Sequence, residues 1–354
     1  MSLSLTSSRV GAYLACPRRH QWAYEFQIRR EQDGVRLSVG SGYHRGLEAI
    51  LLGRSVEEAA NAAREGIESE IDREIAACMV AGWSWRWQNA PLFKRVLATE
   101  KVFEYRPVKG ARWTWAGKID AIGVLEDDRI AVAEFKTTTD PIDPKSNYWR
   151  RLLIDRQISG YVLGARALGF DRVDTVMYDV AKVPDIAPRQ VPLLDEDGMK
   201  VVLNASGERV FNMKKGGGIG DPRQSADKEK GWVLQTRTET PEEFSDRFMA
   251  DIGNRPDHYY NRMEIPRLPS DLEEAEADFA HFASMIRQSQ KAGRWPRNTD
   301  ACMRWGVCPY FDPCSSMHDP EQHGLPSGFK RVDDVHVELT IAATNQENAD
   351  GSTE

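Results

Sequence analysis

Apolar residues in the first ninety positions recur at the spacing of helices. Val10, Tyr13 and Leu14 share one face of an expected first helix. A second helix is expected after Gly42. The Ala- and Glu-rich stretch 56–79, with opposite charges four residues apart, predicts one long exposed helix.

Beyond the hundredth position the pattern changes to runs of β-branched and aromatic residues separated by turn residues. The runs 101–108, 111–125 and 129–137 predict an antiparallel meander. A helix is expected over 148–168 and a further strand over 173–183. Strands, then a helix, then a strand are typical of an α/β core, so the predicted fold class is α/β.

The rest of the pattern completes a single predicted domain over residues 1–330. Its expected parts are a helical N-terminal part (1–100), a catalytic α/β core (101–183), an inserted hairpin with a mobile loop (184–235) and a helical C-terminal part (236–330). From Asp333 onward there are six acidic residues and no Lys or Arg. Residues 331–354 are therefore predicted to form a solvated, disordered tail.

Composition places the chain among ordinary soluble globular proteins. Of its 354 residues, 41% are hydrophobic and 29% are charged, and no apolar run approaches the ~18 residues that span a bilayer. The N-terminus shows no secretory signal, so the expected location is the cytoplasm of a bacterial or phage-infected cell. The net charge of −7 argues against a passive nucleic-acid coat, but a DNA-processing enzyme needs only a local basic groove.

The candidate catalytic residues lie on two neighbouring predicted strands: Asp120 on one, and Glu134 and Lys136 on the next. Residues two apart on a strand project to the same face, so Glu134 and Lys136 point together. A turn near Asp127 would bring Asp120 beside them. Two carboxylates and an ammonium group would then converge at the ends of adjacent strands.

This trio suits the hydrolysis of a phosphodiester. Carboxylates are preferred ligands of Mg²⁺ or Mn²⁺, which polarise a phosphate and acidify a bound water. Lys136 could orient that water or offset the growing negative charge. A surface salt bridge on an exposed strand is the plainer interpretation of Glu-x-Lys alone. The upstream Gly-x-x-Asp segment makes a chance combination less plausible.

The next helix carries Gln157-Ile-Ser-Gly-Tyr161, whose two end residues stand four apart on one face. The order Asp, Glu-x-Lys, Gln-x-x-x-Tyr resembles the RecB-type branch of the PD-(D/E)XK nuclease superfamily. The segment Gly40-Ser-Gly-Tyr-His44 resembles the Gly-x-x-x-His helix of that branch. The resemblance covers roughly residues 5–320. It implies a restriction-endonuclease-like core with a mixed central sheet between helical N- and C-terminal parts.

The resemblance also implies a role for each matching residue. The Mg²⁺ or Mn²⁺ ligands would be His44, Asp120, Glu134 and the carbonyl of Phe135, and the catalytic or substrate-contacting residues would be Asp120, Glu134, Lys136, Gln157 and Tyr161. Taken alone, His44 would more often be an ordinary helix histidine. Gln157 and Tyr161 alone would be a polar helix face.

Four of the five cysteines stand near the two ends of the chain: Cys16, Cys302, Cys308 and Cys314. A reducing cytoplasm does not favour disulfides. The placement resembles the iron–sulfur subset of these nucleases, which includes CRISPR adaptation nucleases, AddB-type nuclease subunits and phage exonucleases. There a 4Fe-4S cluster on four thiolates joins the chain ends. Here both late gaps hold five residues, wider than the commoner Cys-x2-Cys-x5-Cys, and a structural Zn²⁺ is the chemical alternative.

Phosphate contacts are expected from paired basic residues. The pairs are Arg18-Arg19, Arg29-Arg30, Arg150-Arg151 and Lys214-Lys215. Most single basic residues are simply solvated, so each pair on its own is a weak indication.

The predicted function is a metal-dependent DNA nuclease, an exonuclease that acts on single-stranded ends in recombination, repair or phage DNA processing. A helicase or recombinase is a candidate partner. One alternative is a structure-specific endonuclease, because cleavage mode depends on whether a tunnel encloses the strand. The other is a non-catalytic DNA-binding or assembly subunit that keeps the fold, against which the intact motif set speaks.

Overall fold

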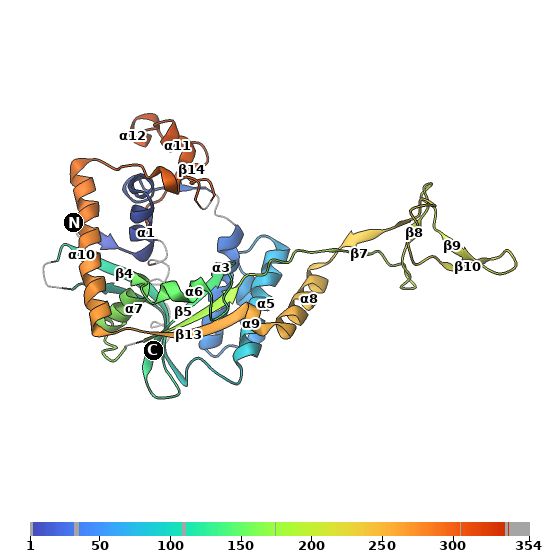
Figure 1. The fold of residues 1–354 in the computed structure, drawn as a ribbon, viewed down its shortest axis with the longest axis horizontal. Helices are drawn as coiled ribbons and strands as arrows, with labels where there is room; N and C mark the ends of the chain where they lie inside the picture. Colours follow the sequence, from blue (N-terminus) through green and yellow to red (C-terminus); the bar gives the residue numbers. More distant parts are fainter. Residues whose placement is uncertain are drawn as a thin grey trace, which may run out of the picture.

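The computed structural model describes residues 3–31, 35–107, 111–173, 175–304, 306–336 and 339. Its centre is a six-stranded sheet (Figure 1). The strand order is β1 (Leu3–Leu5), β4 (Trp113–Val124), β5 (Ile130–Thr138), β6 (Thr175–Lys182) and β13 (Tyr260–Pro266), with β3 (Arg95–Tyr105) also paired to β4. The β1–β4 and β5–β6 pairs are parallel and the others antiparallel. The predicted α/β class with a mixed central sheet is thus confirmed.

Helices cover both faces of the sheet, each over a hydrophobic core. One core includes side chains of α7 (Arg156–Ala167) and α10 (Pro269–Ala292). The other is shared with α3 (Val35–Leu51), α4 (Val56–Arg64), α5 (Glu70–Trp87) and α8 (Pro241–Asn254). The shorter helices are α1 (Ser7–Ala15), α2 (Pro17–His20), η1 (Gln21–Glu25), α6 (Asn147–Leu152), α9 (Pro256–Tyr259), η2 (Thr299–Ala301), α11 (Phe311–Ser315) and α12 (Pro320–His323).

Two helices expected to be continuous are each broken in two. The stretch 56–79 divides between α4 and α5, because Gly66 turns with a positive φ of 69° and the Ser69 side chain caps α5. The long exposed helix predicted there is also wrong about exposure, since most of α5 from Ile75 to Trp83 is buried. The stretch 148–168 breaks between α6 and α7, where Asp155 caps α7.

The N-terminal part was expected to be helical, but it also contributes strands. The first strand, β1, lies in the sheet parallel to β4, with Leu3 opposite Trp113. The two ends of the chain also meet, because β14 (Phe329–Arg331) pairs with β2 (Ile28–Arg30). The predicted disordered tail lies largely outside the described residues, although His336 within it is buried.

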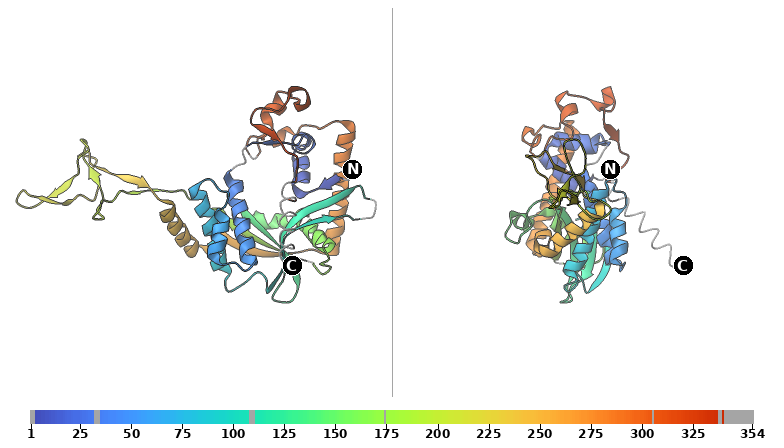
Figure 2. Two further views of the ribbon diagram at one scale, coloured as in Figure 1. Left: turned by 180° about the vertical axis from the view of Figure 1, so that it is seen from behind. Right: turned by 90° about the vertical axis from the view of Figure 1, so that its right-hand side faces the viewer.

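The inserted segment forms a long arm that projects from the body beside α8 (Figures 1 and 2). It consists of three successive two-stranded ribbons: β7 (Gln190–Pro192) with β12 (Thr236–Thr238), β8 (Val202–Leu203) with β11 (Val233–Leu234), and β9 (Phe211–Met213) with β10 (Ile219–Pro222). Among the described helices, none has the length and apolar character needed to cross a membrane.

Candidate active site

Asp120 and Glu134 lie where strands β4 and β5 separate. Their ladder runs from Val124 opposite Ile130 to Ala121 opposite Ala133 and stops there. Beyond it, the backbone N–H of Phe135 donates to Oδ2 of Asp120 at 2.8 Å. The Asp120 side chain thus takes the place of a ladder partner, which fixes its carboxylate at the fork of the two strands.

His44 faces the same carboxylate from helix α3. Its Nδ1 lies 3.5 Å from Oδ1 of Asp120. The helix can approach the strand because Gly40 has no side chain: a Cβ there would lie 3.1 Å from Oγ1 of Thr137 on β5. Burial disfavours the charged imidazole, but the Asp120 carboxylate outweighs it and raises the pKa of His44.

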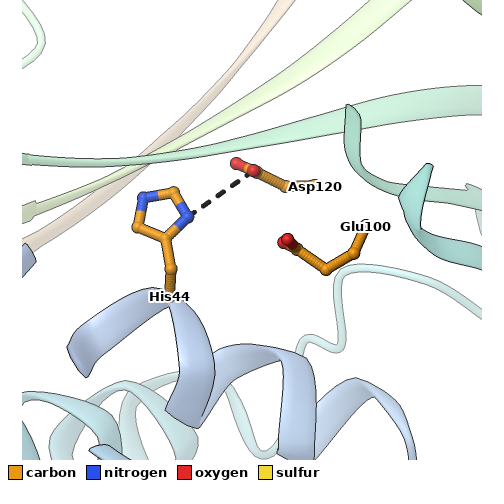
Figure 3. A group of neighbouring side chains, drawn as sticks. All are labelled: His44, Glu100 and Asp120. Atoms are coloured by element: carbon orange, nitrogen blue, oxygen red, sulfur yellow. Dashed lines mark ion pairs between the residues drawn. The ribbon is translucent and has the colours of Figure 1, made fainter. Parts of the chain in front are cut away.

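A third residue, Glu100 on β3, completes a group that could hold a metal ion (Figure 3). Single ligand atoms of His44, Glu100 and Asp120 all lie within 4.8 Å of one another. Glu100 has a left-handed backbone with φ of 51°, and its neighbours Thr99 and Lys101 pair with the two residues that flank Asp120 on β4. Such a conformation costs roughly 1–3 kcal/mol in a non-glycine residue and tends to persist at functional sites.

Sequence reasoning missed Glu100, since no motif marks it and its place depends on the register of two strands. Two further cleft residues were missed with it, Glu48 on α3 and Lys118 on β4. Lys118 forms an ion pair with Glu100. Burial raises the pKa of both Glu48 and Glu100, and the nearby Asp120 carboxylate raises each further.

Glu134 and Lys136 project together from β5, as the strand period requires, and form an ion pair. The Glu134 side chain is only 1% exposed, whereas that of Lys136 is 33% exposed. Burial raises the pKa of Glu134 to about 7 against the opposing charge of Lys136. Neither Glu134 oxygen has a hydrogen bond of regular geometry within the described part of the chain. Glu134 is not a member of the 4.8 Å group that includes Glu100.

Gln157 and Tyr161 stand one turn apart on α7, and the side-chain amide of Gln157 donates to the Tyr161 hydroxyl at 2.7 Å. Two glycines let this helix lie directly on the sheet. A Cβ at Gly160 would lie 2.3 Å from the Trp115 indole nitrogen, and one at Gly164 would lie 2.5 Å from the Phe103 ring. The glycines thereby set the depth of Tyr161 in the cleft.

The cleft has a volume of about 680 Å³ and gathers six of the seven residues predicted for the active site. Those six are His44, Asp120, Glu134, Lys136, Gln157 and Tyr161. Phe135 is the exception: its ring is buried and packs edge-on against Trp83 at 6.1 Å. Its backbone N–H serves Asp120, and its predicted role as a carbonyl ligand stays a prediction.

The four terminal cysteines line one other cavity, of about 320 Å³, together with Arg18, Arg19 and Arg297. All four are free thiols. The N–H of Asn298 donates to Sγ of Cys16 at 3.3 Å, which ties the segment after α10 to the start of the chain. Among the described residues, no three of these sulfurs lie within 4.8 Å of one another.

The basic pairs predicted to contact DNA are dispersed. Arg19, Arg29 and Arg30 line a groove that shares Ser8 with the catalytic cleft. Arg18 lines the cysteine cavity and donates to the carbonyl of Trp295 at 3.1 Å. Arg150 and Arg151 are exposed on α6, and Lys214 and Lys215 stand at the tip of the arm.

Comparison with known proteins gives a matching family and similar solved structures. The family model of the PD-(D/E)XK nuclease superfamily matches residues 4–315. No curated protein matches the chain. A crystal structure from Eubacterium rectale, described as a "Putative exonuclease", is similar at 10% identity and a TM-score of 0.40, over 86% of this chain and 89% of that one.

Proposed function

This chain belongs to the PD-(D/E)XK nuclease superfamily, and from that premise we propose that it is a deoxyribonuclease that depends on Mg²⁺ or Mn²⁺. We further propose that it works as an exonuclease on single-stranded ends. One observation carries the proposal: four carboxylates, an imidazole and two ammonium groups converge in one cleft from α3, β3, β4 and β5.

The donor set fits a hard divalent cation. His44, Glu100 and Asp120 already present ligand atoms within 4.8 Å of one another. The Glu134 carboxylate lines the same cleft beside the Lys136 ammonium group and could join this set of ligands. Imidazole and carboxylate ligands suit Mn²⁺ or Mg²⁺. When bound, such an ion would polarise the scissile phosphate and lower the pKa of a water molecule.

The remaining side chains would position the substrate and balance its charge. Lys136 is partly exposed while its ion-pair partner Glu134 is buried, so its ammonium group can meet a phosphate oxygen in the cleft. The hydrogen-bonded pair Gln157 and Tyr161 lines the same cleft and would orient the nucleotide there. With Glu134 1% exposed at the base of the cleft, a separated strand would reach the site more readily than a duplex.

We also propose that Cys16, Cys302, Cys308 and Cys314 hold a 4Fe-4S cluster. A 4Fe-4S cluster is held by four cysteine thiolates, and these four cysteines line one cavity. Arg18, Arg19 and Arg297 line the same cavity and would offset the charge of the thiolates. We expect the enzyme in the cytoplasm, where such thiols stay reduced.

The test is the degradation of end-labelled single- and double-stranded DNA by anaerobically purified protein with Mg²⁺ or Mn²⁺. Lys136→Ala should reduce cleavage at least about a hundredfold. The matched control is Lys94→Ala, which removes a surface lysine paired with Asp128 outside the cleft and should leave the rate unchanged. No cleavage by folded wild-type protein, or full cleavage by Lys136→Ala, would contradict the proposal.

A further inference from the structure

The arm, residues 187–238, is fixed at its base rather than loosely attached. Glu239, at the end of the returning strand, accepts hydrogen bonds from Arg247 of α8 at 2.8 and 2.7 Å and from the N–H of Arg189 at 3.1 Å. Arg237 makes a second two-bond ion pair with Glu243 of α8, at 2.6 Å for each bond. Two bidentate pairs on one helix hold the direction of the arm.

The tip of the arm exposes an apolar face. Met213 and Ile219 are opposite each other in the β9–β10 ribbon, and Phe211 lies two residues from Met213. The three side chains therefore share one face, and they are 73%, 71% and 40% exposed, respectively. A two-stranded ribbon is marginally stable on its own. Such an apolar face on an isolated ribbon indicates a surface that is covered by a partner.

The charge of the arm indicates what that partner is. The arm has nine Lys or Arg and seven Asp or Glu, in a chain whose net charge is −7. From Arg209 to Arg223 the balance is four basic residues to one acidic residue. Lys214 and Lys215, at the turn of the tip, make no ion pair within the described ranges. A polyanion complements this surface.

The turn itself suits close approach to a backbone of phosphates. Gly216 and Gly217 have φ of 119° and 90°, and Cβ atoms built on Gly216, Gly217 and Gly218 meet nothing within 4 Å. The backbone of the turn is thus open to a ligand. Basic side chains beside apolar wedges on a ribbon are the means by which architectural proteins grip and bend the minor groove of DNA.

We propose that the arm binds duplex DNA next to the end that the enzyme cleaves, with Lys214 and Lys215 on phosphates and Met213 and Ile219 against base edges in the minor groove. This inference rests on the proposed nuclease function. The arm leaves the body beside α8 (Figure 2), and none of its residues lines the catalytic cleft. It would therefore hold the duplex part of a substrate whose single-stranded end occupies that cleft.

The first variant removes the tip without disturbing the rest of the arm. The N–H of Arg223 donates to the carbonyl of Val210 at 2.9 Å, so these two residues can flank a two-residue Asn-Gly turn that replaces 211–222. We expect binding to a duplex with a single-stranded overhang, measured by fluorescence anisotropy without a divalent metal, to weaken at least about tenfold. Cleavage of a short single-stranded oligonucleotide should not change, which also verifies that the variant folds.

Two further variants separate the contribution of the lysines to DNA binding from that of the apolar side chains. Each phosphate contact contributes about 0.9 to the slope of log K against log salt, so Lys214→Ala with Lys215→Ala should flatten the slope by about 1.8. The affinity deficit of that variant would then be about twelvefold larger at roughly 50 mM than at roughly 200 mM salt. Met213→Ser with Ile219→Ser should weaken binding and leave the slope unchanged. Lys94→Ala with Lys291→Ala, two exposed lysines outside the arm, is the control for equal charge removal.

Each outcome supports or contradicts the proposal that the arm binds duplex DNA. Unchanged duplex affinity in the tip variant would overturn the proposal, as would an equal loss in the lysine control. A tip-dependent dimer with unchanged DNA binding would assign the apolar face to a second copy of the chain and also overturn it. If wild-type protein binds the duplex through the tip yet cleaves no DNA, the nuclease proposal fails and the arm remains a DNA-binding element.

Discussion

Helix α7 packs closely on the sheet at Gly164, and a side chain added there should destabilise the protein. In Gly164→Ala, the new Cβ would lie 2.5 Å from the ring of Phe103, which is 2% exposed. The same ring also packs closely on its cross-strand partner Gly117, where a Cβ would lie 2.9 Å from it, so it has little room to move away from α7. Overpacking of this kind costs about 1–3 kcal/mol. The replacement of glycine by alanine in a helix returns about 1 kcal/mol.

The control is Gly253→Ala in α8, where a Cβ would meet nothing within 4 Å. Both variants gain the same helix propensity, so the difference between their free energies of unfolding isolates the packing cost of about 1–3 kcal/mol at Gly164. Chemical denaturation at equilibrium measures it. Because α7 also carries Gln157 and Tyr161, Gly164→Ala should slow DNA cleavage as well. Equal stability of the two variants would refute the claim that Gly164 sets the depth of this helix.

Three further predictions concern the metal sites. Glu100→Gln should weaken Mn²⁺ binding by about tenfold or more, measured by titration calorimetry, if Glu100 is a ligand; an unchanged affinity would show that it is not. Without metal, Glu134 has a pKa raised to about 7, so its anionic form is lost as pH falls through 7. This loss alone should lower the apparent Mn²⁺ affinity about tenfold from pH 8 to pH 6, and protonation of His44 adds to it. Glu134→Gln should lose this component of the pH dependence. Cys16→Ala should yield little folded protein, and a soluble, fully stable and metal-free variant would contradict the cluster.

Some of the site could be predicted from local periodicity alone. Glu134 and Lys136 share a face because a strand repeats every two residues, and they form an ion pair. Gln157 and Tyr161 share a face because a helix turns every 3.6 residues, and they are hydrogen-bonded at 2.7 Å. Helix breaks were harder to predict, since Asp155 and Ser69 act as caps only when the chain actually turns before them.

Pairing between segments far apart in the sequence determined the features that local patterns could not predict. Glu100 reaches Asp120 and His44 only through the register of β3 on β4 and a left-handed backbone at one residue. Two strands join the sheet beside partners that are far away in the sequence: β1 pairs with β4, and β13 pairs with β6. No local periodicity encodes such a pairing. The arm is another case, because each of its three ribbons pairs a strand of the outgoing half of the segment with a strand of the returning half.

The sequence by itself determined the α/β class, the order of the catalytic motifs and the faces on which their side chains lie, because these follow from local backbone geometry. Only the tertiary structure decided that His44, Glu100 and Asp120 meet, that four distant cysteines line one cavity, and that residues 187–238 stand away from the body. Those outcomes depend on packing between distant segments. The free energy of that packing comes from excluding water over the whole core rather than from any local motif.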